Sequence, residues 1–258
     1  MVHRYSKLGV SALLLGVSSC SVYVPMQGAA PEIRAKGEVE VTGSWALSDR
    51  VDVGATYSPL PHLLVRAAAS FKGSVPPYPD SASYSQNNQY ELALGTYWPL
   101  GEHWLVGGLA GFGRARAQAR YIDDGATLFT FREPIRHQLD ANYSKYSGEA
   151  YATFQPSSLV SLGLAYRVVQ LRLTDVTDLG VSVAAAPILR QEPMFYFRLR
   201  PEFAQRSLQF QLALGASSTF GYRRDAHDET DPARQFKLGR SYTSVGVAFY
   251  PHLLWQKK

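Results

Sequence analysis

Apolar residues alternate with small or polar residues through most of the chain after residue 36, which is the period-two pattern of β-strands. In Ser207–Gly221, leucine and phenylalanine at every second position share one face, and glutamine, alanine and glycine share the other. Leu159–Arg167 and Tyr242–Tyr250 repeat this pattern, and Val39–Trp45 shows a shorter form of it. The alternation predicts an all-β domain.

The alternation changes phase once. Two valines, Val168 and Val169, are adjacent, and the leucines that follow them no longer share the phase of those that precede them. A β-bulge inserts one residue and shifts the faces in this way. We therefore expect a bulge at Val168–Val169.

Connections between the predicted strands alternate between short and long. Proline marks four tight connections, at 57–62, 97–103, 154–158 and 200–205, whereas 72–86, 123–137, 175–192 and 223–237 are long polar segments. This rhythm predicts an up-and-down antiparallel barrel of about ten strands, with short turns at one rim and long loops at the other. Aromatic residues beside the short turns are expected to form an interfacial girdle: Tyr57, Tyr97, Trp98, Phe154, Tyr250 and Trp255.

The polar face of the predicted strands carries many charged side chains. In a membrane barrel the apolar face meets lipid, so these charges would line the lumen and pair there. The alternative is a soluble, lipocalin-like periplasmic cup, with charges outside and a hydrophobic ligand inside. The membrane barrel is the favoured interpretation, and its expected lumen network comprises Glu38, Glu40, Arg66, Glu91, Arg114, Arg116, Arg167, Arg198 and Arg200.

Three arginines of the strand around residues 104–121 allow a second interpretation. Arg114, Arg116 and Arg120 share one face, opposite alanines. They are expected to be lumen arginines paired with glutamates, but the same spacing would also make a basic patch for an anionic lipid or ligand.

The first nineteen residues have the features of a secretory signal peptide. A short basic start is followed by the apolar run Gly9–Val17 and by small residues before Cys20. The only cysteine of the chain stands where a bacterial lipobox has its acylated cysteine, although Val17 replaces the preferred leucine. We expect residues 1–19 to be a lipoprotein signal peptide, 20–35 an acylated tether and 36–258 the barrel; the alternative is an ordinary signal peptide with an incidental cysteine.

Composition narrows the classes of function. The net charge is +5, and removing Arg4 and Lys7 with the signal peptide would leave 24 basic and 21 acidic residues, too small an excess to indicate nucleic-acid binding. A single cysteine excludes a disulfide framework within the chain and a multi-cysteine metal site. After the signal region no apolar run is long enough for a transmembrane helix.

Candidate chemistry is sparse. The six histidines show no metal-binding spacing, and no nucleophile elbow, Walker loop or dinucleotide fingerprint occurs. The acidic segment 225–231 would suit a divalent cation or simply a solvated loop. A lipid-modifying enzyme would need a histidine, a serine and a carboxylate, for which His137, Ser144, Ser147 and Asp140 are the candidates. No cofactor is indicated.

Several short motifs resemble a group of uncharacterised outer-membrane barrel lipoproteins of Gram-negative bacteria. They are 20–25 at the lipobox, 36–40 opening the first strand, 55–59, 62–63 and 111–114. The resemblance implies a lipid-anchored barrel in the outer membrane and no known chemistry. It agrees with the prediction from the residues, in which the membrane contacts Cys20 and the barrel exterior. The expected function is structural, or the binding of a ligand or protein at the long loops, with a lipid-modifying enzyme or the periplasmic cup as alternatives.

Overall fold

The barrel is built from ten long strands, one short strand and two single-turn helices. The computed structural model describes residues 21–26, 28–73, 84–123, 135–201, 207–222 and 233–255. The elements are β1 (Val39–Ala46), β2 (Arg50–Tyr57), β3 (Leu64–Lys72), β4 (Tyr84–Leu100), β5 (Trp104–Asp123), β6 (Ile135–Phe154), β7 (Val160–Asp178), β8 (Val181–Ser182), β9 (Ile188–Leu199), β10 (Leu208–Thr219), α1 (Arg234–Lys237), β11 (Arg240–Phe249) and α2 (His252–Trp255).

The sheet closes on itself. Each long strand pairs antiparallel with the next one along the chain, and β1 pairs with β11, with Val41 opposite Phe249. The two-residue β8 pairs only with the end of β7. Closure gives each of the ten long strands a partner on both sides, which leaves no long edge to attract other strands. The predicted ten-stranded up-and-down barrel is thus confirmed.

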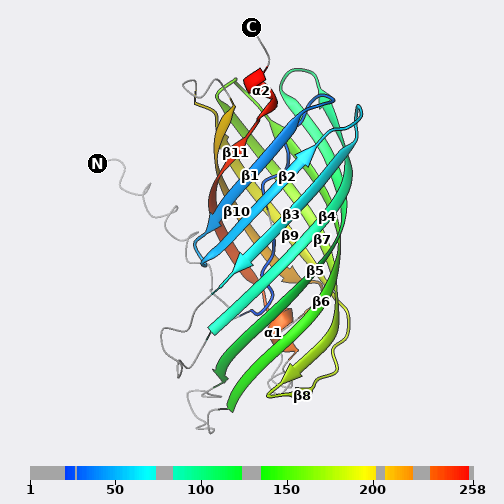
Figure 1. Cartoon of the computed structure of the whole chain (residues 1–258), viewed down its shortest axis with the longest axis vertical. Coiled ribbons are helices and arrows are strands. Elements are labelled where there is room, and N and C mark those ends of the chain that lie inside the picture. The colour runs from blue at the N-terminus through cyan, green and yellow to red at the C-terminus, as the bar shows by residue number, and fades with distance from the viewer. Residues whose placement is uncertain are drawn as a thin grey trace, which may run out of the picture.

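The two ends of the barrel differ (Figure 1). The end that carries α2 holds the short connections such as 101–103 and 155–159, and we call it the short-turn end. The other, the long-loop end, carries β8 and α1. Strands β4 to β7 have 17 to 20 residues, against 8 or 9 for β1 to β3, so the wall is taller on the β4–β7 side. Of the described helices, neither has the length or hydropathy needed to cross a bilayer.

The apolar face of the strands points outward. Leu92 and Leu164 are 65% and 63% exposed, and Phe210 and Val245 are also exposed, whereas Arg198 is completely buried. A protein in water would hide these leucines and expose the arginine. The faces are therefore those of a membrane barrel, and the soluble cup with an apolar interior is excluded.

Aromatic side chains form a girdle at the short-turn end, but some of the residues expected in that girdle do not belong to it. Tyr57, Trp98 and Trp104 are about half exposed on the outer face, and the ring of His62 stacks on Trp98 at 4.0 Å. Tyr97 and Tyr250 do not belong to this girdle, because their side chains are buried. Their hydroxyls instead make hydrogen bonds inside the barrel, that of Tyr97 with Ser58 at 3.0 Å and that of Tyr250 with Glu40 at 2.9 Å.

The expected bulge at Val168–Val169 is wrong. The β6–β7 register runs without a break past both valines and shifts only where Asn142 and Tyr143 face Asp175 and Leu173, which leaves Thr174 as the extra residue. Val169 and Leu171 stay on the buried face with Tyr23 and Phe236. The change seen in the sequence is one of chemistry, because the lumen face becomes apolar near the long-loop end.

Leu92→Arg tests the outward face. Leu92 lies six residues from Trp98, which places it about 15 Å into the membrane band, near its middle. A charge there is expected to lower the free energy of unfolding by about 2–4 kcal/mol, whereas Leu92→Ala should cost less than about 1 kcal/mol. Both are measured by urea titration, following the gel-mobility difference between unheated and boiled protein. Equal effects of the two substitutions, or no mobility difference in the wild type, would contradict the lipid-facing assignment.

Candidate functional site

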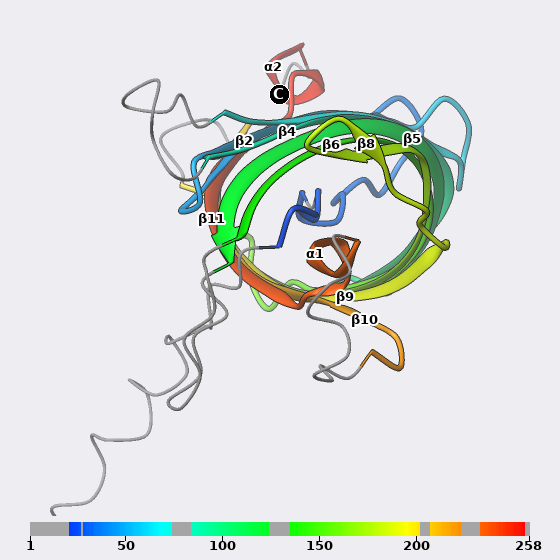
Figure 2. The ribbon, with the colours of Figure 1, turned by 90° about the horizontal axis from the view of Figure 1, so that it is seen from below.

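The interior of the barrel is filled by its own N-terminal residues. The segment 21–34, described except for residue 27 and called here the lumen segment, runs from α1 at the long-loop end to the start of β1 at the short-turn end (Figure 2). Val24, Ala30 and Ile33 are completely buried. Residues expected to be a loose tether are thus part of the core.

Barrel side chains hold the lumen segment by its backbone. An extended segment without a strand partner leaves its carbonyl groups unpaired, and buried carbonyls need donors. Five barrel side chains supply them. Arg240 donates to the carbonyl oxygen of Ser21 at 3.3 Å, Asn87 to Val22 at 3.4 Å, Gln89 to Val24 at 2.9 Å, Arg50 to Pro25, and Arg167 to Met26 at 2.6 Å.

An acidic cluster fixes the segment near the short-turn end. Glu32 of the lumen segment and Glu40 of β1 both face Arg198, whose guanidinium lies 3.8 Å and 3.1 Å from their carboxylates. The backbone amide of Glu32 also donates to Glu40 Oε2 at 2.8 Å. Gln209 and Ser161 donate to Glu32 as well. Each buried charge therefore has a partner of opposite sign, as burial requires.

A second cluster lies midway along the lumen. Glu91 accepts from Arg167 and lies 3.3 Å from the ammonium of Lys145. Lys145 also donates to the side-chain oxygen of Gln89 at 2.9 Å. Because Gln89 and Arg167 bind the lumen segment themselves, this ion cluster and the segment hold one another in place.

The long-loop end of the segment packs on α1. The Tyr23 ring lies 4.6 Å under the guanidinium of Arg190, and its hydroxyl donates to Glu192 at 2.7 Å. Arg190 also donates to the carbonyl of Phe236 in α1 at 2.6 Å. The backbone amide of Val22 donates to the carbonyl of Gln235 at 3.2 Å. The first described residues of the lumen segment therefore lie beside α1 at the long-loop end.

The predicted lumen network is only partly assembled in the lumen. Glu40, Arg66, Glu91, Arg167 and Arg198 are buried there, with Arg66 3.6 Å from Glu149. Arg200 lies beyond the end of β9, half-buried and 3.7 Å from Glu32, and Glu38 lies at the rim, where it accepts from the Arg34 amide at 2.7 Å.

The prediction that Arg114 and Arg116 belong to the lumen network is wrong. Both are exposed on the outer wall, and alternate alanines, among them Ala115 and Ala117, face the lumen instead. The interior there is occupied by Tyr23, Tyr143 and Phe236, which leave room only for small side chains on β5. Five further lumen side chains were not expected in the network, although strand periodicity places each of them on the lumen face: Arg50, Asn87, Gln89, Lys145 and Arg190.

The candidate enzymatic group does not assemble. His137 Nδ1 lies 2.6 Å from Asp178, not beside Asp140, which is bound to Arg116 on the outer wall at 2.8 Å. Ser144 and Ser147 lie seven and ten residues along β6 from His137, about 23 and 33 Å at the usual rise per residue. Cys20 and the acidic segment 225–231 lie outside the described residues. Among the residues described, no group of three or more potential ligands could hold a metal.

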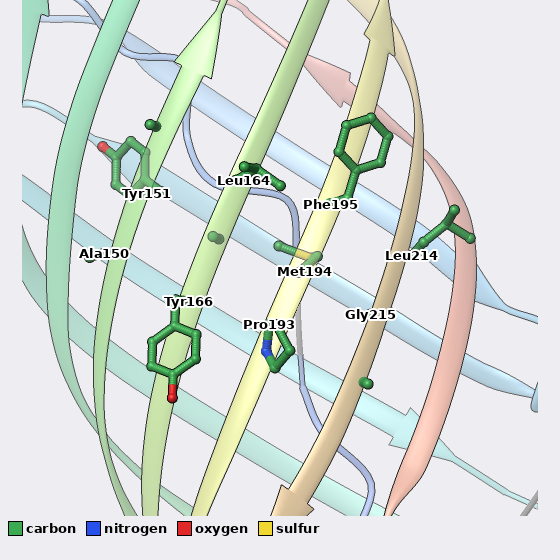
Figure 3. A pocket seen from close by; sticks show the side chains of 12 residues that line it. Ala150, Tyr151, Leu164, Tyr166, Pro193, Met194, Phe195, Leu214 and Gly215 are labelled. Atoms are coloured by element: carbon green, nitrogen blue, oxygen red, sulfur yellow. The ribbon is translucent and has the colours of Figure 1, made fainter. Parts of the chain in front are cut away.

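A hollow of about 770 Å³ lies on the outer wall across β6, β7, β9 and β10. Small residues such as Ala150 and Gly215 form its floor, and Leu164, Tyr166 and Phe195 rise beside it (Figure 3). It belongs to the apolar exterior, and lipid chains would fill it like the rest of that surface.

Comparison with known proteins finds similarity to bacterial outer-membrane β-barrels among solved structures. No protein-family model matches the chain, and no curated protein matches it. Among solved structures, the translocator domain of the autotransporter NalP from Neisseria meningitidis has 11% identity over 82% of this chain and 86% of that chain, with a TM-score of 0.45. The outer-membrane protease OmpT from Escherichia coli has 8% identity over 83% and 93%, with a TM-score of 0.45. LpxR from Salmonella typhimurium has 6% identity over 83% and 99%, with a TM-score of 0.35. At this distance the similarity carries no information on activity.

Glu91→Gln tests the midway ion cluster. The substitution keeps the shape of the side chain but leaves Arg167 and Lys145 without their buried anion. We expect the free energy of unfolding to fall by about 3–5 kcal/mol. The matched control is Glu102→Gln in an exposed short turn, which should change it by less than about 0.5 kcal/mol. Urea unfolding in one detergent compares them, and a Glu91 variant as stable as the control would show that the cluster does not hold the lumen together.

Proposed function

We propose that the chain is an outer-membrane lipoprotein barrel that closes its own lumen with its N-terminal segment and presents its long loops for a structural or binding role. The observation that carries this proposal is the lumen segment, most of whose described residues are buried and which is bound through five of its backbone carbonyls. A barrel built to conduct solutes would leave this space to water. The interior favours a closed, structural barrel over a porin.

The path of the lumen segment bears on where a lipid would be attached. Ser21, the residue next to the proposed acyl site, lies beside α1 at the long-loop end, with its hydroxyl donating to the Gln235 carbonyl at 3.1 Å. In outer-membrane barrels the short turns face the periplasm and the long loops face the exterior. An acyl group on Cys20 would then enter the leaflet on the exterior side. Anchor and loops would share one face of the membrane.

Lipid attachment would reinforce the plug. Acyl chains stabilise membrane attachment by about 0.8 kcal/mol for each buried methylene group. An anchor at the long-loop end fixes one end of the lumen segment, and β1 fixes the other. The segment is then held at both ends and along its length, which supports a permanent plug rather than a mobile gate.

The acyl anchor is tested by metabolic labelling. Cells producing the full chain are grown with radiolabelled palmitate, and label is expected in the wild type and in Ser21→Ala but not in Cys20→Ala. Ser21→Ala is the control because it changes the adjacent residue and leaves the thiol. Label retained by Cys20→Ala would refute lipid attachment at this residue, without bearing on the barrel.

The path of the segment is tested by a disulfide. Val22→Cys combined with Gln235→Cys should cross-link on mild oxidation, because their backbones share a hydrogen bond of 3.2 Å. Val22→Cys with Lys36→Cys, whose sites lie at opposite ends of the barrel, should not. Thiol alkylation after denaturation, read by mass spectrometry, counts the free cysteines. A folded, heat-modifiable barrel in which the first pair stays reduced would exclude the proposed plug.

A further inference from the structure

Five arginines face outward near the long-loop ends of β5, β6 and β7. They are Arg114, Arg116 and Arg120 on β5, Arg136 on β6 and Arg172 on β7, and we call them the arginine patch. Their outward direction follows from the alternation of burial along each strand, because the buried residues Ala115, Ala117, Ala119, Leu139 and Leu171 lie on the opposite face. On the outer wall of these strand ends, the described acidic side chains are Asp140 and Asp175. The patch is therefore strongly basic.

The height of the patch corresponds to a lipid headgroup region. Arg114 is ten residues beyond Trp104, and Arg172 ten beyond Leu162 near the start of β7. At the usual rise and tilt of barrel strands, ten residues span about 25 Å, which is the height of the apolar band of such barrels. Arg114 and Arg172 thus mark the far edge of that band.

Strand register places Arg114 and Arg172 on either side of one serine. Arg114 is directly opposite Ser144, and Ser144 is directly opposite Arg172. Two strand spacings, about 9.6 Å, separate the two arginine backbones. Two guanidinium groups and a hydroxyl can converge on a phosphate across this gap, since guanidinium pairs with phosphate through parallel hydrogen bonds.

The two arginines are available for a ligand. Arg116 is already bound to Asp140, at 2.8 Å, and Gln118 donates to the same carboxylate. Among the described residues no acidic side chain forms an ion pair with Arg114 or Arg172, and Arg172 instead lies 5.1 Å over the ring of Tyr146. This contact holds the Arg172 guanidinium at the wall without neutralising it.

The surface beside the arginines suits acyl chains. On the membrane side, the next row across the strands is Leu92, Phe112 and Tyr146, and the last two rings lie 5.2 Å apart. A groove of about 790 Å³ runs past Arg114 on the outer wall, across the rows of Arg114 and Arg116, and its lining includes the rings of Phe71 and Tyr90 as well as Ser144 and Asp175. A phosphate held by the patch would therefore have an apolar surface below it.

We propose that Arg114, Ser144 and Arg172 bind the phosphate of an anionic membrane lipid in the leaflet at the long-loop end of the barrel. The proposal rests on the membrane placement argued above. The phosphate lies between the two guanidinium groups and accepts from the Ser144 hydroxyl, while the acyl chains lie along Phe112 and Tyr146. Charge recognises the headgroup, and the position of the charge at the edge of the apolar band selects lipid over free phosphate.

Native mass spectrometry of the full chain in detergent tests the proposal, with phosphatidic acid, phosphatidylcholine and inorganic phosphate as separate probes. Retention of phosphatidic acid should exceed that of phosphatidylcholine by about tenfold or more, and inorganic phosphate should not be retained. Each surface arginine contributes about fivefold to the attraction of an anionic lipid. Arg114→Gln and Arg172→Gln should each lower retention of phosphatidic acid about fivefold, and the double variant should lower it to the level of phosphatidylcholine.

Lys36→Gln is the matched control, because it removes one exposed positive charge at the short-turn end and should leave retention unchanged. Each variant is first shown to be a folded barrel by its heat-dependent gel mobility, so loss of the barrel is distinguished from loss of the site. Retention of phosphatidic acid by the double variant at the wild-type level would overturn the proposal. Equal loss in Lys36→Gln would assign the effect to net charge, and retention of inorganic phosphate would overturn the lipid assignment.

Discussion

The structure depends on the pairing of charges inside a narrow, closed barrel. Arg198 and Arg167 are buried in the wall and would be strongly destabilising without partners. Glu40 and Glu91, also on the wall, supply part of the neutralisation, and Glu32 from the lumen segment supplies more. The wall and the segment it surrounds are therefore one electrostatic unit, in which neither part is satisfied without the other.

This unit determines the path of the lumen segment through the barrel. Once donors such as Gln89 and Arg167 bind the carbonyls of the lumen segment, its course from α1 to β1 is set. Ser21, the residue next to the proposed acyl anchor, then lies beside α1 at the long-loop end. A closed interior and the course of the lumen segment follow from one arrangement of buried charge.

The same residue type serves opposite purposes on the two faces of one wall. Arg167 points inward, where an anion must be built in because water is scarce. Arg172, five positions later on β7, points outward at the edge of the apolar band, where a membrane lipid can supply the anion. Whether an arginine stands at an odd or an even position along its strand determines which face it occupies. That face, rather than the chemistry of the side chain, determines whether the arginine forms a structural ion pair or is a candidate binding group.

The alternation of side chains by itself determined the strands, because a period of two follows from strand geometry alone. The alternation of short and long connections determined the number of strands and their up-and-down order, and the charges on the polar face indicated which face meets lipid. Long-range proximity decided the rest. Residues 21–34 show no periodicity, and only the closed wall reveals that they are core, since their partners lie up to about two hundred positions away in the sequence. Arg114 and Arg116 were expected in the lumen because the residues next to them in the sequence do not show which face of β5 packs against the lumen segment. Tertiary structure settled that, by filling the interior opposite Ala115 with Tyr23, Tyr143 and Phe236 and leaving only the outer wall to the arginines.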